Sequence, residues 1–320
     1  MALYLVTGGA GFIGSNIVEE LLRQGERVRI LDNFSTGKRE NIDNIKKIMQ
    51  QEKNSTAYKK LELVEGDVRS YHIVREAVEG VNFILHQAAL PSVPRSVKDP
   101  LTSNEVNVVG TLNILNAAKE AKVKRIVYAS SSSVYGDLEV LPKTEEMLLN
   151  PLSPYAVSKL AGEKYCQVFT RLYGLETVSL RYFNVFGSRQ DPTSQYSAVI
   201  PKFIALIKEN QPPTIYGDGE QSRDFTFVSN VVEANLLACK VAIEDFCGEA
   251  FNIAYGKRVS INDMVTAMNK LLNTKVDPNY SEPRPGDVKH SLANIGKARQ
   301  FLGYEPKIDF YTGLEKLISA

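Results

Sequence analysis

Short apolar runs alternate with longer segments in which apolar residues recur every three or four positions through the first half of the chain. This alternation is typical of a parallel β-sheet that is covered by helices. The apolar runs predict strands at residues 3–7, 27–31, 61–64, 82–86, 125–129 and 177–180. The helical spacing predicts helices at residues 14–23, 103–122 and 154–173.

The pattern changes at about residue 184, where glycine, proline and charged turn residues separate short helices from single strands. We therefore expect a doubly wound α/β sheet in residues 1–180 and a smaller, mixed α/β domain in residues 181–320, with some segments returning to the first domain. The charged segment 40–60 is interpreted as a solvated helix and loop between the second and third strands, without a catalytic role.

The composition narrows the possible partners. The 320 residues carry 38 Lys and Arg against 37 Asp and Glu, so the net charge of +1 attracts neither nucleic acid nor an acidic membrane surface. No stretch approaches the ~20 apolar residues of a membrane span. Three cysteines without a CxxC pair and three histidines argue against a disulfide framework and a metal cluster. We expect a soluble cytoplasmic protein that binds no metal.

A glycine-rich sequence, TGGAGFIG at residues 7–14, follows the first predicted strand and opens the first predicted helix. Glycines at this place form a tight turn, let a pyrophosphate approach the backbone and let the helix pack on the strand. The helix N-terminus adds free N–H groups and a partial positive charge. The pattern predicts a Rossmann-type sheet that binds a dinucleotide, and its three glycines can be read either as Gly8, Gly11 and Gly14 or as Gly9, Gly11 and Gly14.

Asp32 follows the second predicted strand, about 20 residues beyond the glycines, where a carboxylate accepts hydrogen bonds from the adenosine ribose. A 2′-phosphate at this place would meet a like charge, so the carboxylate favours NAD over NADP. Lys38 and Arg39 lie close by in the sequence and would favour the opposite choice. The carboxylate at the end of the strand is the more direct contact, and we expect NAD.

Tyr155 and Lys159 are one helical turn apart, so their side chains share a helix face. A tyrosine must lower its pKa by about three units from 10 to act as a base at neutral pH. A nearby ammonium group and an oxidised nicotinamide would both favour the phenolate. Ser131 follows the fifth predicted strand, where open α/β sheets hold ligands, and can bond the same substrate oxygen.

Read in order, these and further motifs resemble the extended short-chain dehydrogenase/reductase superfamily. The residues that carry the resemblance are TGGAGFIG at 7–14, Asp32, GDV at 66–68, HQAA at 86–89, SSSVYG at 131–136, Tyr155 with Lys159, RYFN at 181–184, GDG at 217–219, RDF at 223–225 and RPGD at 284–287. Within the superfamily the chain looks like a nucleotide-sugar 4-epimerase of the UDP-N-acetylglucosamine and UDP-glucose 4-epimerase family, most like the former branch.

The resemblance implies a reaction in which bound NAD is reduced and restored within one turnover, so that only the configuration at C4 of a UDP-sugar changes. Tyr155 would remove the proton of the 4-hydroxyl, Lys159 would hold the nicotinamide ribose and favour the phenolate, and Ser131 would share the sugar oxygen. The implied cofactor contacts are Gly8, Gly11, Phe12, Ile13, Asp32, Asn33, Ser35, Gly37, Asp67, Val68, Gln87, Ala88, Ala89, Tyr155, Lys159 and Phe183.

The matching substrate positions are Ser92, Ser131, Tyr155, Asn184, Val199, Tyr216, Arg223, Arg284, Asp287 and Ser291. Arginines suit a diphosphate and a carboxylate suits ribose hydroxyls. Glucose-specific relatives have a bulky tyrosine where this chain has Ser291, which leaves room for an N-acetyl group that Ser92 could bond. We therefore expect UDP-GlcNAc and UDP-GalNAc as substrates, with UDP-Glc and UDP-Gal as poorer ones.

Other activities of the superfamily remain alternatives. Related 4,6-dehydratases carry an Asp-Glu pair, and decarboxylases a glutamate, at the positions of Ser132 and Ser133. A non-catalytic NAD-binding module would have lost the tyrosine or the lysine. The resemblance also implies a homodimer through helices 103–122 and 154–173, where Leu112, Leu115, Val168 and Leu172 face either the partner or the sheet.

Overall fold

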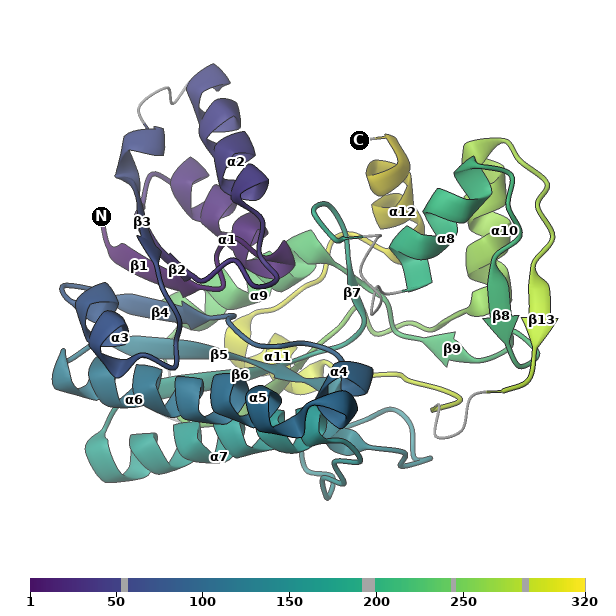
Figure 1. The fold of residues 1–320 in the computed structure, drawn as a ribbon. Helices are drawn as coiled ribbons and strands as arrows, with labels where there is room; N and C mark the ends of the chain where they lie inside the picture. The colour runs from purple at the N-terminus through teal and green to yellow at the C-terminus, as the bar shows by residue number, and fades with distance from the viewer. Residues whose placement is uncertain (53–56, 192–198, 243–245, 284–287, 320) are drawn as a thin grey trace.

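The computed structural model describes residues 1–52, 57–191, 199–242, 246–283 and 288–319 (Figure 1). Its centre is a parallel sheet of seven strands in the order β11-β6-β5-β4-β1-β2-β3. The strands are β1 (Leu3–Thr7), β2 (Arg27–Asp32), β3 (Leu61–Glu65), β4 (Phe83–His86), β5 (Arg125–Ser131), β6 (Glu176–Tyr182) and β11 (Ala250–Ile253). The strand order runs outward from β1 in both directions, so the predicted doubly wound α/β fold is confirmed.

Helices cover both faces of the sheet because each sheet face carries apolar side chains that must be buried. One core holds buried side chains of α1 (Phe12–Arg23), α2 (Arg39–Gln51), α9 (Val228–Lys240) and α11 (Gly296–Leu302). The core on the opposite face holds those of α3 (Tyr71–Val78), α6 (Gly110–Glu120) and α7 (Pro154–Tyr173). Figure 1 shows α6 and α7 along the lower face of the sheet.

The helix predicted at residues 103–122 is interrupted. The structure has α5 (Pro100–Asn104), one π-helical turn at Glu105–Val109 and then α6. Asn107 lies in that turn, where its side chain accepts a bond from the Leu90 amide (2.8 Å) and donates to the Ser158 hydroxyl (3.0 Å). A π turn changes the direction of a side chain within a helix. Here it directs the side-chain amide of Asn107 inward, which the apolar pattern did not predict.

The segment 40–60 contains the predicted helix, with one face packed on the sheet. One side of α2 contributes Ile42, Ile45 and Met49 to the same core as α1, while the opposite side of the helix stays exposed. The short turn η1 (Ala57–Lys60) then leads into β3. The charged residues thus occupy the outer face of an amphipathic helix.

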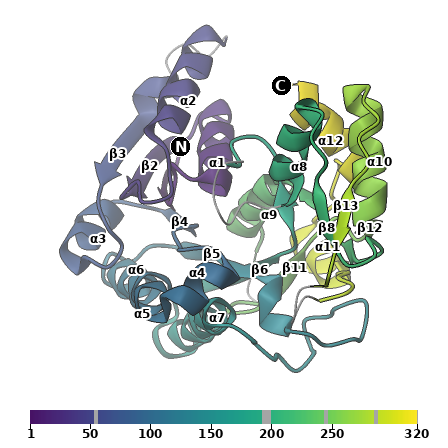
Figure 2. The same cartoon turned by 45° about the vertical axis from the view of Figure 1, so that its right-hand side comes forward.

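The second half forms a smaller unit beside the sheet (Figure 2). Its core, which is rich in phenylalanine, packs side chains from α8 (Val199–Lys208), α10 (Ile261–Leu272) and α12 (Phe310–Ser319). Three two-stranded ladders complete it: β7 (Val185–Phe186) with β10 (Thr226–Phe227), β8 (Thr214–Tyr216) with β13 (Asn279–Ser281), and β9 (Ser222–Arg223) with β12 (Val259–Ser260). The segments β11, α9 and α11 belong instead to the layers of the large sheet.

Two further short helices, α4 (Val93–Lys98) and α5, follow β4 and lie against α7 (Figure 1). The carboxyl ends of β1, β4, β5 and β6 therefore open toward these helices and the smaller unit. In the described part of the chain, no helix is both long and apolar enough to cross a membrane.

Candidate active site

The glycine loop after β1 is built for close approach. Gly8 has φ +67°, and a Cβ atom on it would lie 2.8 Å from the backbone nitrogen of Ala88. A Cβ on Gly14 would collide with the carbonyl of Gly8. Gly11 caps the start of α1 without a side-chain bond to the first-turn amides. The loop thus presents bare backbone and a helix N-terminus, which is the arrangement that holds a pyrophosphate.

Asp32 ends β2 next to this loop. Its carboxylate accepts bonds from the backbone amides of Ala10 (2.9 Å) and Phe34 (2.8 Å). Burial raises the pKa of Asp32, and the two amides oppose that rise. A carboxylate has about four acceptor positions, so both oxygens can still accept bonds from ribose hydroxyls.

The two cations near Asp32 are engaged elsewhere. Lys38 pairs with Asp191 at 3.2 Å, and Arg39 pairs with Glu65 at 2.5 Å. Each of these two cations therefore already has a carboxylate partner and is not reserved for a 2′-phosphate. This pairing supports the argument from Asp32 for NAD.

A cavity of about 220 Å³ lies between the glycine loop, the end of β2 and α7. Thirteen of the predicted cofactor residues line it, namely Gly8, Gly11, Phe12, Ile13, Asp32, Asn33, Ser35, Val68, Gln87, Ala88, Ala89, Tyr155 and Lys159. The other three lie outside its lining. Gly37 packs against Ala10 and Asp32, Asp67 accepts a bond from Asn33 (2.8 Å), and Phe183 lines the neighbouring cavity.

The start of α7 fixes the predicted tyrosine and lysine. Ser153 caps the helix by accepting a bond from the Ala156 amide (3.1 Å), and the Tyr155 amide donates to the Ser96 hydroxyl (3.0 Å). Lys159 is buried, and its Nζ donates to the carbonyl of Ala129 at the end of β5 (2.7 Å). The same Nζ lies 5.9 Å from the centre of the Tyr155 ring. Both side chains line the cofactor cavity.

Burial acts on these two groups in opposite directions. It raises the pKa of Tyr155, and the hydroxyl of Ser131 opposes the rise by hydrogen bonding. It lowers the pKa of Lys159 to about 8, and the negative charge of Glu163 opposes the fall. The protein groups by themselves therefore keep the phenol protonated at neutral pH, so a further positive charge beside Tyr155 is needed for the phenolate.

A second cavity, of about 450 Å³, adjoins the first. The two share four lining residues, Ile13, Ser130, Tyr155 and Tyr182. Six predicted substrate residues line the second cavity: Ser92, Ser131, Tyr155, Asn184, Arg223 and Ser291. Tyr155 therefore stands in the wall between the two cavities.

Of the other predicted substrate residues, the described Val199 and Tyr216 do not line this cavity. Val199 begins α8, and Tyr216 is partly exposed at the end of β8. Arg284 and Asp287 lie outside the described residues. Ser92 has φ +96° and caps α4 by accepting a bond from the Arg95 amide (3.4 Å), so its hydroxyl already has one partner.

The sequence did not point to three residues that line the two cavities or lie behind their walls. Tyr182 lines both cavities, and its hydroxyl bonds the side chains of Gln87 (3.2 Å) and Asn235 (3.1 Å). Asn107 is linked to Tyr155 by hydrogen bonds: its side chain donates to the hydroxyl of Ser158, which in turn donates to the Tyr155 carbonyl (2.7 Å). A polar residue inside the apolar stripe of 103–122 was the available signal for Asn107. Glu163, the third, comes one turn after Lys159.

The sequence matches the model of a family described as the NAD dependent epimerase/dehydratase family over residues 4–254, well over half of the chain. The chain belongs to this family. This epimerase is 36% identical over 315 residues to the UDP-glucose 4-epimerase of Mycolicibacterium smegmatis, and the match covers 98% of the chain and 96% of that relative.

Two solved structures share the fold of this epimerase over 99% of its chain. The UDP-N-acetylglucosamine 4-epimerase of Methanobrevibacter ruminantium M1, in complex with UDP-N-acetylmuramic acid, has a TM-score of 0.91, 38% identity and 97% coverage of that chain. The UDP-glucuronic acid 4-epimerase of Bacillus cereus, in complex with UDP-glucuronic acid and NAD, has a TM-score of 0.87, 30% identity and 98% coverage of that chain.

These comparisons confirm the predicted family resemblance, the Rossmann-type fold and NAD as the cofactor. They also confirm that the chain is an enzyme, an isomerase of the 4-epimerase type. The glycine loop and Asp32 fit the cofactor, because bare backbone faces the place of the pyrophosphate and a carboxylate faces that of the ribose.

Proposed function

We propose that this epimerase inverts C4 of UDP-N-acetylhexosamines, interconverting UDP-GlcNAc and UDP-GalNAc, with UDP-Glc and UDP-Gal as poorer substrates. The observation that carries the proposal is Tyr155, which lines both cavities together with Ser130 and Tyr182. A base in that wall can reach the hydroxyl of a sugar in the second cavity while the carbon that bears this hydroxyl lies next to the cofactor cavity.

In the proposed reaction, Tyr155 Oη removes the proton of the sugar 4-hydroxyl and later returns it. NAD, when bound, would supply reversible hydride chemistry at C4 and a positively charged ring that favours the phenolate. Lys159 holds the nicotinamide ribose and adds its own positive charge. Ser131 bonds the same sugar oxygen, which supports proton transfer at that atom. No net oxidation results.

The preference for N-acetylated sugars rests on Ser291 and Ser92. Both side chains line the second cavity, and a serine at position 291 leaves more room there than a tyrosine would. The relative from M. ruminantium, which is a UDP-N-acetylglucosamine 4-epimerase, supports this choice. The relatives from M. smegmatis and B. cereus act on UDP-glucose and UDP-glucuronic acid, so the family itself spans several sugars.

The UDP moiety is proposed to lie toward the smaller unit. Arg223, on β9, lines the second cavity and offers a guanidinium to the diphosphate. Asn184, Val199 and Tyr216 are proposed to complete this side, together with Arg284 and Asp287 of the RPGD motif. We also propose that the enzyme is a homodimer.

The test of the reaction is incubation of the purified protein with UDP-GlcNAc and no added NAD. Formation of UDP-GalNAc supports the proposal and also shows that the cofactor stays bound through turnover. A 4-keto-6-deoxy product would instead indicate a dehydratase. That outcome is not expected, because Ser132 and Ser133, which line the cavity, cannot exchange protons as carboxylates do.

Tyr155→Phe removes only the phenolic oxygen. We expect turnover to fall at least about 1,000-fold, because a general base contributes roughly 10²–10⁴ and the hydroxyl also orients the sugar. Binding of NAD and UDP, measured by calorimetry, should change little. Turnover equal to that of the wild type would exclude Tyr155 as the base.

A further inference from the structure

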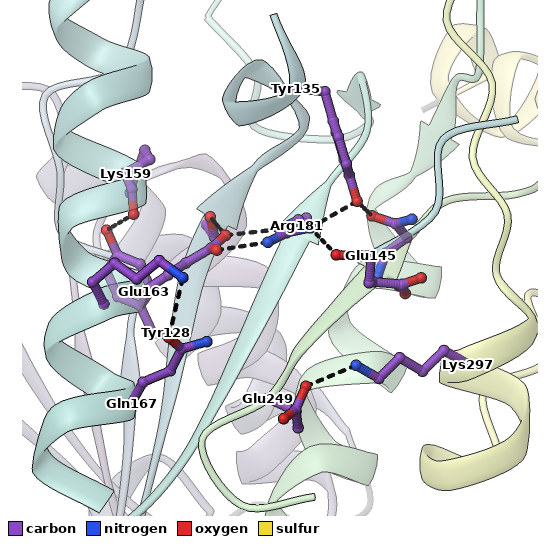
Figure 3. A network of polar contacts seen from close by, with 12 residues as sticks. Tyr128, Tyr135, Glu145, Lys159, Glu163, Gln167, Arg181, Glu249 and Lys297 are labelled. Atoms are coloured by element: carbon purple, nitrogen blue, oxygen red, sulfur yellow. Dashed lines mark hydrogen bonds and ion pairs between the residues drawn. The ribbon is translucent and has the colours of Figure 1, made fainter. Parts of the chain in front are cut away.

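A buried ion pair lies one helical turn beyond Lys159. Arg181 of β6 donates from Nε to Oε1 of Glu163 (2.9 Å) and from Nη2 to Oε2 (2.8 Å). The exposed fractions of the two side chains are 5% and 1%. Figure 3 shows Arg181 between Glu163 and Tyr135, whose hydroxyl accepts a third bond from Arg181 (2.8 Å). Tyr135 itself lines the second cavity.

Consecutive residues at the end of β5 connect this pair to the site. The Ala129 carbonyl accepts a bond from Lys159 Nζ (2.7 Å), and the next residue, Ser130, donates its hydroxyl to Oε1 of Glu163 (2.5 Å). The residue after that is Ser131. Lys159 and Glu163, four residues apart on α7, therefore hold the strand immediately before the serine that faces the substrate cavity.

The titratable groups that face Lys159 come from three elements. Tyr155 and Glu163 are on α7, Tyr128 is on β5 with its ring 5.2 Å from Nζ, and His86 is on β4. Burial raises the pKa of Tyr128 and of Tyr155 and lowers that of His86 to about 3, so these three are neutral near pH 7. Among the described residues, Glu163 is thus the carboxylate that faces the ammonium.

We propose that Glu163 is a positioning residue for the epimerisation: its carboxylate keeps the Lys159 ammonium charged, and its bond with Ser130 fixes the end of β5 beside Ser131. The inference rests on the proposed function, in which Lys159 and Ser131 act on cofactor and sugar. Arg181 tunes the effect, because it orients the carboxylate while offsetting part of its charge.

A purely structural role explains the arrangement less well. Buried ion pairs stabilise a fold little compared with apolar residues of similar volume, so stability alone does not favour one here. Strand β6, which carries Arg181, forms another ion pair at its opposite end, where its first residue, Glu176, accepts a bond from Arg125 of β5 at 2.8 Å. That pair offers a control for the loss of an ion pair on β6, since it holds the opposite end of this strand, away from Lys159.

The decisive variant is Glu163→Gln, which keeps the shape and an acceptor oxygen but removes the charge. We expect the pH at which Lys159 loses its proton to fall by about one unit, as for the loss of an opposite charge one helical turn away. NMR titration of protein labelled at the lysine Cε carbons measures this midpoint without catalysis, and Lys159→Met assigns the signal. In activity assays, the pH at which kcat declines on the alkaline side of its profile should fall by the same amount, while KM should change little.

Two further variants separate charge from structure. Glu176→Gln should lower the melting temperature while leaving the Lys159 midpoint and the alkaline limb in place. In Glu163→Gln/Arg181→Met both charges are gone, so the midpoint should return toward the wild-type value, which a loss of packing would not achieve. A Lys159 midpoint unchanged in Glu163→Gln overturns the inference. Absence of UDP-GlcNAc turnover by the wild type would contradict the proposed function instead, and the NMR midpoint would still test Glu163.

Discussion

The proposed preference for N-acetylated sugars depends on one small side chain, that of Ser291. It lines the second cavity beside His290, and its amide donates to the carbonyl of Ser222 (3.0 Å), which holds the segment in place. The backbone position is therefore fixed from outside the cavity. A change of side chain at 291 should act mainly on the volume available to the substituent at C2.

We expect Ser291→Tyr to reduce kcat/KM for UDP-GlcNAc by about 10- to 200-fold and to change that for UDP-Glc much less. This is the range that one pocket residue usually contributes to discrimination. Paired assays with both substrates measure the effect, and Ser291→Ala, which adds no volume, is the control. Equal losses on both sugars would argue against contact between residue 291 and the N-acetyl group.

At the residue scale, the sequence predicted those site residues whose chemistry follows from local motifs. The glycine loop, Asp32, Tyr155 and Lys159 each combine a fixed spacing with a place at the end of a strand or the start of a helix. Glu163 could not be predicted in the same way. Its meaning depends on Ser130 and Arg181, which approach it only when β5 and β6 pack against α7.

At the scale of elements, α7 has one face in the core and one in solvent. Cys166 and Phe169 are buried against the sheet, whereas Val157, Val168 and Leu172 are exposed along the outer side. Leu101 on the adjoining α5 is exposed as well. Leu115 of α6, which was also considered for a dimer interface, is buried in the core and therefore cannot contact a partner.

The exposed apolar side of α5 and α7 predicts the dimer contact. Leu172, with an exposed fraction of 68%, is the variant site of choice. We expect the wild type to be a dimer by light scattering after size-exclusion chromatography, and Leu172→Glu to weaken the dimer at least tenfold by burying a charge. Leu148→Glu is the control, because Leu148 is 87% exposed on a loop before α7. A monomeric wild type would contradict the proposed dimer.

Most elements were predicted because each carries its own periodicity. The six strands of the first half and the helix at Pro154–Tyr173 lie where apolar spacing predicted them. The π turn at Glu105–Val109 and the entry of β11 into the large sheet were beyond such patterns. Both depend on partners distant in sequence: Asn107 on Leu90, and β11 on β6.

At the scale of the whole molecule, a buried histidine ties stability to pH. His86 lies at the centre of the sheet between the hydroxyls of Thr7 (2.7 Å) and Thr111 (3.0 Å). Burial, and to a lesser degree the charge of Lys159, lowers the pKa of His86 to about 3. The unfolded chain binds this proton near pH 6.5 and the folded chain does not, so the stability from His86 is present above pH 6.5 and is lost as pH falls toward 3.

We therefore expect the free energy of unfolding to fall by about 1.4 kcal/mol per pH unit below pH 6, from this group alone. Urea denaturation of the wild type and of His86→Gln between pH 7.5 and 5 measures the difference in slope. His72→Gln serves as the control, because His72 is exposed on α3. The expectation fails if wild type and His86→Gln lose stability in parallel.

The two cavities are lined by largely different residues, which bears on how substrate preference can evolve. Among the described residues, those that line the first cavity lie between positions 8 and 182, whereas the second cavity is also lined by Arg223, Val288, His290 and Ser291. If the second cavity holds the sugar, as proposed, we expect substitutions at residues 288–291 to change which hexose is accepted while binding of the dinucleotide stays the same. Directed evolution toward a new sugar substrate should therefore begin by randomising residues 288–291.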